Sequence, residues 1–212
     1  MLFRSIDVDE AKDRYYKKLN INPFWEEIDV VNSLNRVTFE AVYALVSSPN
    51  YNAAAMDGIA VRSSDTKSAT EINPVILEEN KDFVYINTGN PIEEPYNAVI
   101  MIEDIIDLGN GKIKIIKSAH PWQHVRPIGE DIVATEMILP SRHKIRPIDI
   151  GALLSGGIEK IKVYKQPKVG IIPTGSEIVE KVSQLQFGKI IDSNSRVFEG
   201  LILENGGIAN RY

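Results

Sequence analysis

Hydrophobic residues near the start of the chain recur at the three- and four-residue spacing of a helix. This spacing predicts a helix over about residues 8–19, and Asp7 followed three positions later by Glu10 has the form of an N-terminal capping box. A second short helix is expected over residues 30–35, and a β-rich stretch follows over residues 37–46. The apolar face of the first helix would hold Val8, Ala11, Tyr15 and Leu19.

From about residue 50 to 133 the pattern changes to short apolar runs separated by turn residues. Gly109, Asn110 and Gly111 lie between two such runs and are a strong signal for a β-hairpin. Lysines then alternate with isoleucines, as in a strand with one buried face. We expect a small all-β module here, with strands over residues 59–62, 75–77, 83–87, 98–103, 105–108 and 113–117.

Helical and strand patterns mix again after this module. The expected elements are a strand over 135–139, a helix over 146–155 with Pro147 in its first turn, and a strand over 161–164. Residues 168–173 form an apolar run typical of a buried parallel strand. A further helix should follow residue 194 and a further strand should start at Ile208. The residues of this helix expected to point inward are Val197, Leu201 and Ile202.

These elements predict a multidomain α+β protein. Residues 1–45 and 135–165 flank the β module, so they are expected to form one discontinuous helix and strand domain with residues 46–134 inserted as an all-β domain. Residues 166–212 would begin an α/β domain. We expect this third domain to be incomplete, because a parallel sheet needs more strands and covered faces than one strand, one helix and a strand stub provide.

Composition and charge narrow the function classes. The chain has 212 residues, 43% of them hydrophobic, with a net charge of -5 and a pI near 5.3. An acidic balance argues against a nucleic-acid partner and against a membrane-surface helix. There is no cysteine, which excludes disulfides and thiolate chemistry, and there is no long apolar run, so no membrane partner is expected. A cytoplasmic location is the expectation.

Five turns carry side chains that suit anion or metal chemistry. Thr-Gly turns after strands expose backbone N–H groups and a hydroxyl, which suit phosphate or another oxyanion. Carboxylates that converge on one place would hold Mg²⁺. Each turn alone is more often a plain turn, and the last one is better explained as a helix cap. The turns are residues 56–58, 87–91, 129–131, 174–177 and 192–194.

The order of the segments that contain these turns is informative as a whole. Residues 51–61 read YNAAAMDGIAV, residues 87–91 read NTGNP, and residues 125–132 read VRPIGEDI. Residues 148–157 read IDIGALLSGG, and residues 167–177 read PKVGIIPTGSE. Together they resemble the signature segments of the MoeA family, the molybdopterin molybdenumtransferases of molybdenum-cofactor biosynthesis. The resemblance covers essentially the whole chain.

The resemblance implies both a fold and an activity. The third domain would share the α/β fold of molybdopterin-binding proteins, and the protein would be a homodimer with its active cleft between subunits. The reaction would insert molybdenum from molybdate into adenylylated molybdopterin (molybdopterin-AMP), a small-molecule pterin substrate, with release of AMP and with Mg²⁺ as cofactor.

The resemblance also implies roles for individual residues. By motif, Asp57, Asp131 and Glu177 would be the catalytic residues and would handle Mg²⁺ or molybdate. The residues that would bind the substrate or an oxyanion are Thr88, Gly89, Thr174 and Gly175. The departures from the family pattern are Ala55 in place of serine, Ile59 in place of an aromatic residue, and Ser176 in place of aspartate.

Other functions stay open at this point. The glycine- and serine-rich segment that the family carries later in its third domain is absent from these 212 residues. We therefore expect this chain to be an N-terminal portion that is inactive by itself. The alternative is a non-catalytic dimerisation or scaffolding module of the same family. An unrelated β-rich anion binder would explain each turn singly but not their shared order.

Overall fold

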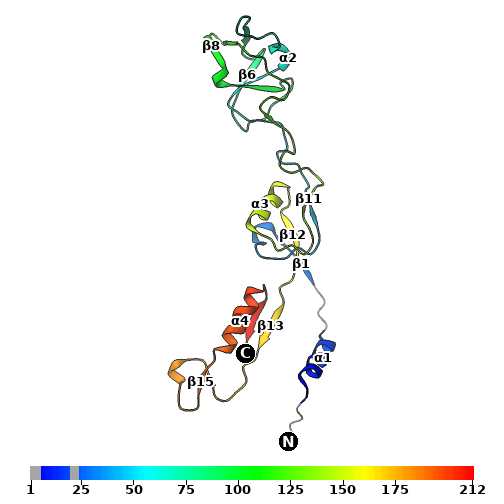
Figure 1. Cartoon of the computed structure of the whole chain (residues 1–212), viewed down its shortest axis with the longest axis vertical. Helices are drawn as coiled ribbons and strands as arrows, with labels where there is room; N and C mark the ends of the chain where they lie inside the picture. Colours follow the sequence, from blue (N-terminus) through cyan, green and yellow to red (C-terminus); the bar gives the residue numbers. More distant parts are fainter. Residues whose placement is uncertain (1–5, 20–23) are drawn as a thin grey trace. The chain divides into compact units, whose positions relative to one another are not determined.

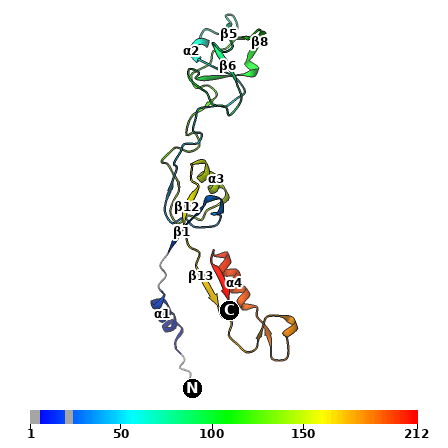
Figure 2. The same cartoon turned by 180° about the vertical axis from the view of Figure 1, so that it is seen from behind.

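The computed structural model describes residues 6–19 and 24–212, and the chain divides into two compact units. Figures 1 and 2 show the chain from opposite sides. The mixed helix and strand content agrees with the expected α+β class. One unit contains Ala41–Pro140 and Arg146–Lys160, and the other contains Met1–Glu40, Ser141–Ile145 and Ile161–Tyr212. The finer division into 1–45 plus 135–165, 46–134 and 166–212 stays a prediction.

Two antiparallel sheets share one core in the first of these units. The strand orders are β6-β4-β7 and β5-β9-β8, and the core is built from buried residues of both sheets, such as Phe83, Ile100 and Ile113. All six strands expected from the apolar runs are present. Figure 1 labels β6, β8 and α2 of this module, and Figure 2 also labels β5. The bounds of its elements are β4 Gly58–Val61, α2 Ser63–Thr66, β5 Val75–Glu78, β6 Phe83–Ile86, β7 Ala98–Met101, η2 Ile102–Asp104, β8 Ile105–Gly109 and β9 Lys112–Ile115.

The predicted hairpin joins β8 and β9. Gly109, Asn110 and Gly111 all have positive φ, of 79°, 53° and 71°. Glycine and asparagine tolerate this left-handed region, so the turn follows directly from the local sequence. Ile113 and Ile115 in β9 are buried, as the alternating pattern predicted.

Two short antiparallel pairs and one helix complete this unit. The pairs are β2 (Val42–Tyr43) with β11 (Met137–Leu139), and β3 (Ala53–Ala54) with β10 (Val125–Arg126). Helix α3 spans Pro147–Ser155, and Pro147 stands in its first turn as predicted. Proline suits that position because its missing N–H would have no partner there.

The second unit begins with the predicted N-terminal helix, α1 (Val8–Lys18). The Asp7 carboxylate accepts a hydrogen bond from the Asp9 N–H at 2.8 Å, which confirms the expected cap. The Glu10 carboxylate pairs with Arg14 instead of completing a capping box. The helix expected over 30–35 is a single 3-10 turn, η1 (Val30–Asn32), which follows β1; strand β1 (Trp25–Asp29) pairs with β12 (Lys160–Tyr164).

Residues 168–211 form a small α/β arrangement. Strand β13 (Lys168–Ile171) pairs in parallel with β16 (Ile208–Arg211), and helix α4 (Asn194–Glu204) packs against both strands. The connection from β13 to α4 contains a second parallel pair and a 3-10 turn. These elements are β14 (Ile178–Val179), η3 (Val182–Gln184) and β15 (Ile190–Ile191).

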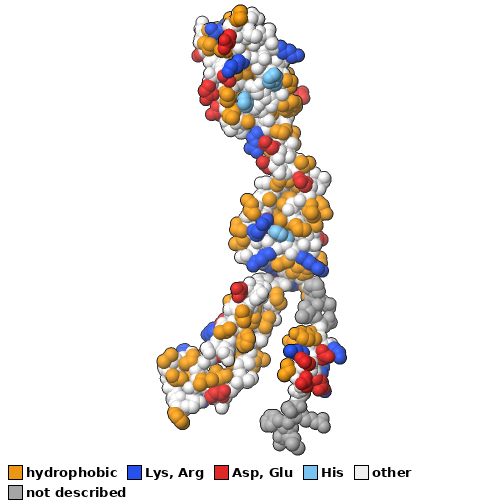
Figure 3. Space-filling view, in the orientation of Figure 1, with side chains coloured by type: hydrophobic (Ala, Val, Ile, Leu, Met, Phe, Trp, Pro, Cys, Tyr) orange, Lys and Arg blue, Asp and Glu red, His pale blue; other side chains and the backbone are white. Residues whose placement is uncertain are grey.

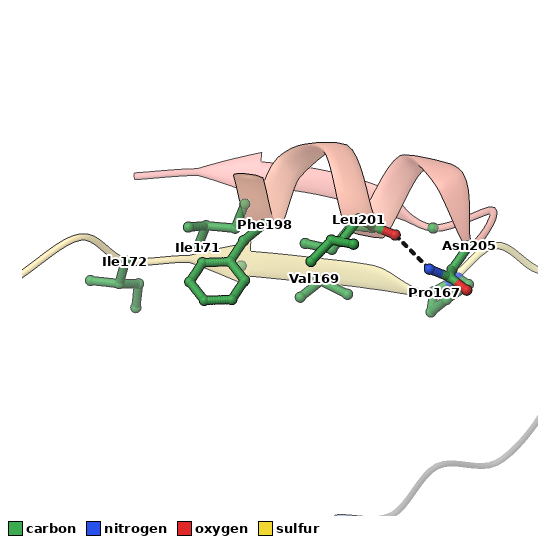
Figure 4. A pocket seen from close by; sticks show the side chains of 10 residues that line it. Pro167, Val169, Ile171, Ile172, Phe198, Leu201 and Asn205 are labelled. Atoms are coloured by element: carbon green, nitrogen blue, oxygen red, sulfur yellow. Dashed lines mark hydrogen bonds between the residues drawn. The ribbon is translucent and has the colours of Figure 1, made fainter. Parts of the chain in front are cut away.

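The expected burial of β13 and of the helix after it is wrong in part. Only Ile171 of β13 is buried, and Val197 and Leu201 of α4 are 59% and 48% exposed. These two strands and one helix leave apolar side chains uncovered, and those side chains line an open groove of about 590 Å³. Figure 4 shows Leu201 of α4 above Val169 of β13 in this groove, with the Phe198 ring beside them. Hydrophobic side chains are also visible on the surface of this region in Figure 3.

No helix within residues 6–19 and 24–212 is both long and apolar enough to span a membrane.

Candidate active site at the Asp57 turn

The turn before β4 is held to the turn after β6 by hydrogen bonds to one carboxylate. Gly58 lies opposite Ile86 in the antiparallel pair of β4 and β6, so the residues just outside this pair, Asp57 and Thr88, come together. The Asp57 Oδ1 atom accepts hydrogen bonds from the Thr88 backbone N–H at 2.7 Å and from the Thr88 hydroxyl at 2.9 Å.

These hydrogen bonds favour the ionised form of Asp57. The pKa of Asp57 is lowered from its ordinary value of 3.8, first by the Thr88 N–H and then by the Thr88 hydroxyl, with a smaller opposing effect of burial. The side chain is exposed, and its second oxygen, Oδ2, accepts no hydrogen bond from the described residues. Asp57 therefore presents one free anionic oxygen to solvent near neutral pH.

The backbone at Asp57 is fixed by the close approach of β7. A β-carbon on Gly58 would lie 1.9 Å from the carbonyl oxygen of Ile100. The Asp57 carbonyl oxygen accepts a hydrogen bond from the Ile102 N–H at 3.0 Å. Glycine is required at position 58 because only glycine leaves room for this approach.

Three of the predicted motifs meet along β3. The Gly89 N–H donates to the Ala54 carbonyl at 2.8 Å, and the Ala54 N–H donates to the Asn90 carbonyl at 2.9 Å. On the other side of β3, Ala53 pairs with Arg126 of β10. The segments around Asp57, Thr88 and Asp131, far apart in the sequence, are thus joined by backbone pairing in one unit.

Asp131 has a cationic partner in this arrangement. The Arg126 Nη2 atom donates to both Asp131 oxygens, at 3.1 and 3.3 Å, and the Arg126 Nε atom donates to Glu130 at 2.5 Å. The pKa of Arg126 is raised, chiefly by its hydrogen bond to Glu130. A metal ion at Asp131 would have to compete with this guanidinium group.

Asp57 offers one carboxylate oxygen that is open to a cation. Mg²⁺ is usually bound by one or two carboxylates while it keeps several waters, and Asp57 Oδ2 is an oxygen of that kind. Within the described ranges, no group of three His, Asp or Glu side chains is arranged to hold a metal. The joint metal site of Asp57, Asp131 and Glu177 stays a prediction.

Two residues that hold the loops together were missed by the sequence reasoning. The Tyr51 hydroxyl donates to the Gly89 carbonyl at 3.2 Å. The Asn52 side chain accepts from the Ile128 N–H at 3.1 Å, and its carbonyl accepts from the Ile92 N–H at 2.8 Å. Their position just before the Asp57 turn was the available signal, but their partners lie tens of residues away.

The predicted Thr174 to Glu177 turn lies in the other unit, at the carboxyl end of β13. Gly175 has φ of 147°, and a side chain there would collide with the Glu177 carboxylate. The Lys189 Nζ atom donates to the Ser176 carbonyl at 2.5 Å. In the described residues, the N–H groups of Thr174 to Glu177 make no backbone hydrogen bond, which leaves them available to an oxyanion.

The fold and the site place this chain in a class of multidomain α+β proteins. In this class a β module carries an Asp-Gly turn that is hydrogen-bonded to a Thr-Gly turn. The family model described as "MoeA N-terminal region (domain I and II)" matches residues 6–157. The chain therefore belongs to the MoeA family.

Several relatives are similar over most of this chain. A protein of Methanocaldococcus jannaschii whose name refers to molybdopterin biosynthesis is 37% identical over 210 residues, which cover 92% of this chain and 52% of that protein. A molybdopterin molybdenumtransferase of Haemophilus influenzae is 32% identical, over 94% of this chain and 52% of that protein. The chain spans about half the length of these relatives.

A solved structure has the same fold. The crystal structure of a molybdopterin biosynthesis MoeA protein from Pyrococcus horikoshii matches with a TM-score of 0.81 and 31% identity. The match covers 96% of this chain and 58% of that chain.

Proposed function

We propose that this chain forms the N-terminal part of a molybdopterin molybdenumtransferase. The reaction inserts molybdenum from molybdate into adenylylated molybdopterin and releases AMP. Membership of the MoeA family and the names of the relatives support this proposal. Because the chain spans about half the length of those relatives, it would contribute the residues of one wall of the active site. The expectation that these 212 residues alone release no AMP belongs to the same proposal.

The observation that carries the proposal is the geometry of Asp57. Its carboxylate is kept ionised by Thr88 and has one oxygen open to solvent. Such an oxygen can hold a cation, whereas it would repel molybdate, which is a dianion. A bound Mg²⁺ would supply positive charge that offsets the negative charge on the oxygens of the substrates. Asp57 would orient that ion.

The other residues of the predicted site have secondary roles in this proposal. Asp131, already paired with Arg126, would orient the loop and contribute negative charge. Thr174 and Gly175 would receive an oxyanion through their free N–H groups, and Glu177 beside them would bind a cation.

A homodimer is part of the proposal. Helix α1 buries none of its residues against the rest of the described chain, and Val8 and Tyr15 on its apolar face are 66% and 63% exposed. An amphipathic helix that buries none of its residues within the described part of the chain favours packing against a second copy. Sedimentation equilibrium should report twice the monomer mass.

The test of the activity is the Asp57→Asn substitution in the complete gene product. We expect molybdate-dependent AMP release to fall by at least about 100-fold, because the amide keeps the shape of Asp57 and loses its charge. The matched control is Asp107→Asn, an exposed carboxylate of the same module whose side chain, within the described residues, accepts a hydrogen bond only from the Gly109 N–H of its own hairpin. Unchanged AMP release in the Asp57 variant would refute the proposal and favour the scaffolding role.

A further inference from the structure

We infer that Thr88 is a positioning residue that orients the Asp57 carboxylate and that it binds no oxyanion of the substrate. Both donors of Thr88, its backbone N–H and its hydroxyl, are directed at the same oxygen of Asp57. A threonine hydroxyl has a single proton to donate. Neither donor is therefore left for a substrate oxygen while Asp57 is held.

The neighbouring donors of this turn are also occupied. The Asn87 N–H donates to the Asn90 side chain at 3.1 Å, and the Asn90 N–H returns to the Asn87 carbonyl at 3.0 Å. The Gly89 N–H donates to Ala54 of β3. Four consecutive N–H groups are thus used within the protein, so the turn lacks the free donors of an anion-binding nest.

The contacts instead hold the exposed residue Asp57 in place, at its backbone carbonyl, at the following glycine and at one side-chain oxygen. The Asp57 backbone carbonyl accepts a hydrogen bond from the Ile102 N–H, and the next residue, Gly58, packs directly against the backbone of β7. The side-chain Oδ1 atom accepts two hydrogen bonds from Thr88. An exposed aspartate would otherwise rotate between rotamers. With Oδ1 occupied, Oδ2 is the oxygen that Asp57 offers to a substrate-bound cation. This inference rests on the proposed function, in which Asp57 acts on the substrates.

The kinetic test uses Thr88→Val and Thr88→Ser in the complete gene product. For Thr88→Val we expect kcat for AMP release to fall about tenfold while KM for molybdate stays within about twofold, because the hydroxyl acts through Asp57 and touches no substrate. Thr88→Ser, which keeps the hydroxyl, should restore kcat to within about threefold of the wild type. A rise in KM at unchanged kcat, no effect of valine, or equal losses for serine and valine would each overturn the inference.

A second readout needs no activity. In the ¹H–¹⁵N spectrum of the 212-residue chain, the Thr88 amide proton should lie downfield, because it donates to a charged oxygen, and Asp57→Asn should move it upfield. The Gly109 amide, which donates to the Asp107 carboxylate at 2.8 Å, is the control that should not move. A Thr88 amide that ignores the substitution would overturn the inference. A responsive amide combined with full AMP release by the Asp57 variant would refute the proposed function alone.

Discussion

At Gly58 the backbone of the module leaves no room for a β-carbon. The Gly58→Ala substitution would place that carbon against Ile100, whose carbonyl oxygen lies 1.9 Å from the ideal position. Because the obstacle is strand backbone, β7 would have to move. We expect the free energy of unfolding to fall by about 3 kcal/mol, the upper end of the usual cost of overpacking. Urea denaturation of the module measures this loss.

Gly151 in α3 is the matched control for this substitution. It lies in a helix of the same unit, and nothing lies within 4 Å of the β-carbon that alanine would add. Gly151→Ala should therefore raise the stability by about 0.5–1 kcal/mol, because alanine loses less backbone entropy than glycine in a helix. Equal effects of the two substitutions would contradict the steric argument.

Among the helices and strands, the N-terminus of α4 depends on one carboxylate. Asp192 accepts hydrogen bonds from the Ser195 hydroxyl and from the Ser195 N–H, the latter at 3.1 Å. The pKa of Asp192 is lowered from 3.8, first by the Ser195 hydroxyl and then by its N–H. A lowered folded-state pKa means that the stabilisation is present above the ordinary pKa and is lost as the pH falls through the folded-state value.

Asp192→Asn should thus destabilise the α4 region near neutral pH. The difference in melting temperature from the wild type should shrink as the pH falls below 3.8, because the wild-type carboxyl then also becomes neutral. Circular dichroism melts of both proteins across this range measure the difference. A difference that stays constant with pH would exclude the charged cap as its source.

Local sequence was sufficient for elements whose signals are local. The helix capped by Asp7 and the hairpin at Asn110 are decided by residues within a few positions of each other. The contact between Asp57 and Thr88 is different, since it spans 31 positions and depends on the register of β4 against β6. The sequence indicates the Asp57 turn and the Thr88 turn separately, but the pattern of apolar residues does not show that β4 pairs with β6.

The exposed groove between β13 and α4 shows a second limit of prediction from the sequence, which concerns burial. An apolar run reports what a strand would bury if it were covered, and Val169 and Leu201 stay exposed because the described elements do not cover them. For the site, the sequence and its family resemblance singled out Asp57 and Thr88. The direction of the two Thr88 donors is evident only in the three-dimensional structure.

For the whole molecule, the uneven distribution of buried residues predicts uneven stability along the 212-residue chain. The central strand β4 is buried at all four positions and pairs with strands on both sides, whereas β13 has one buried residue and, among the described strands, pairs only with β16. Local opening costs least where few apolar contacts are lost. Amide hydrogen exchange should therefore be at least about tenfold faster in Lys168–Ile171 than in Gly58–Val61. Equal protection of the two strands would contradict this expectation.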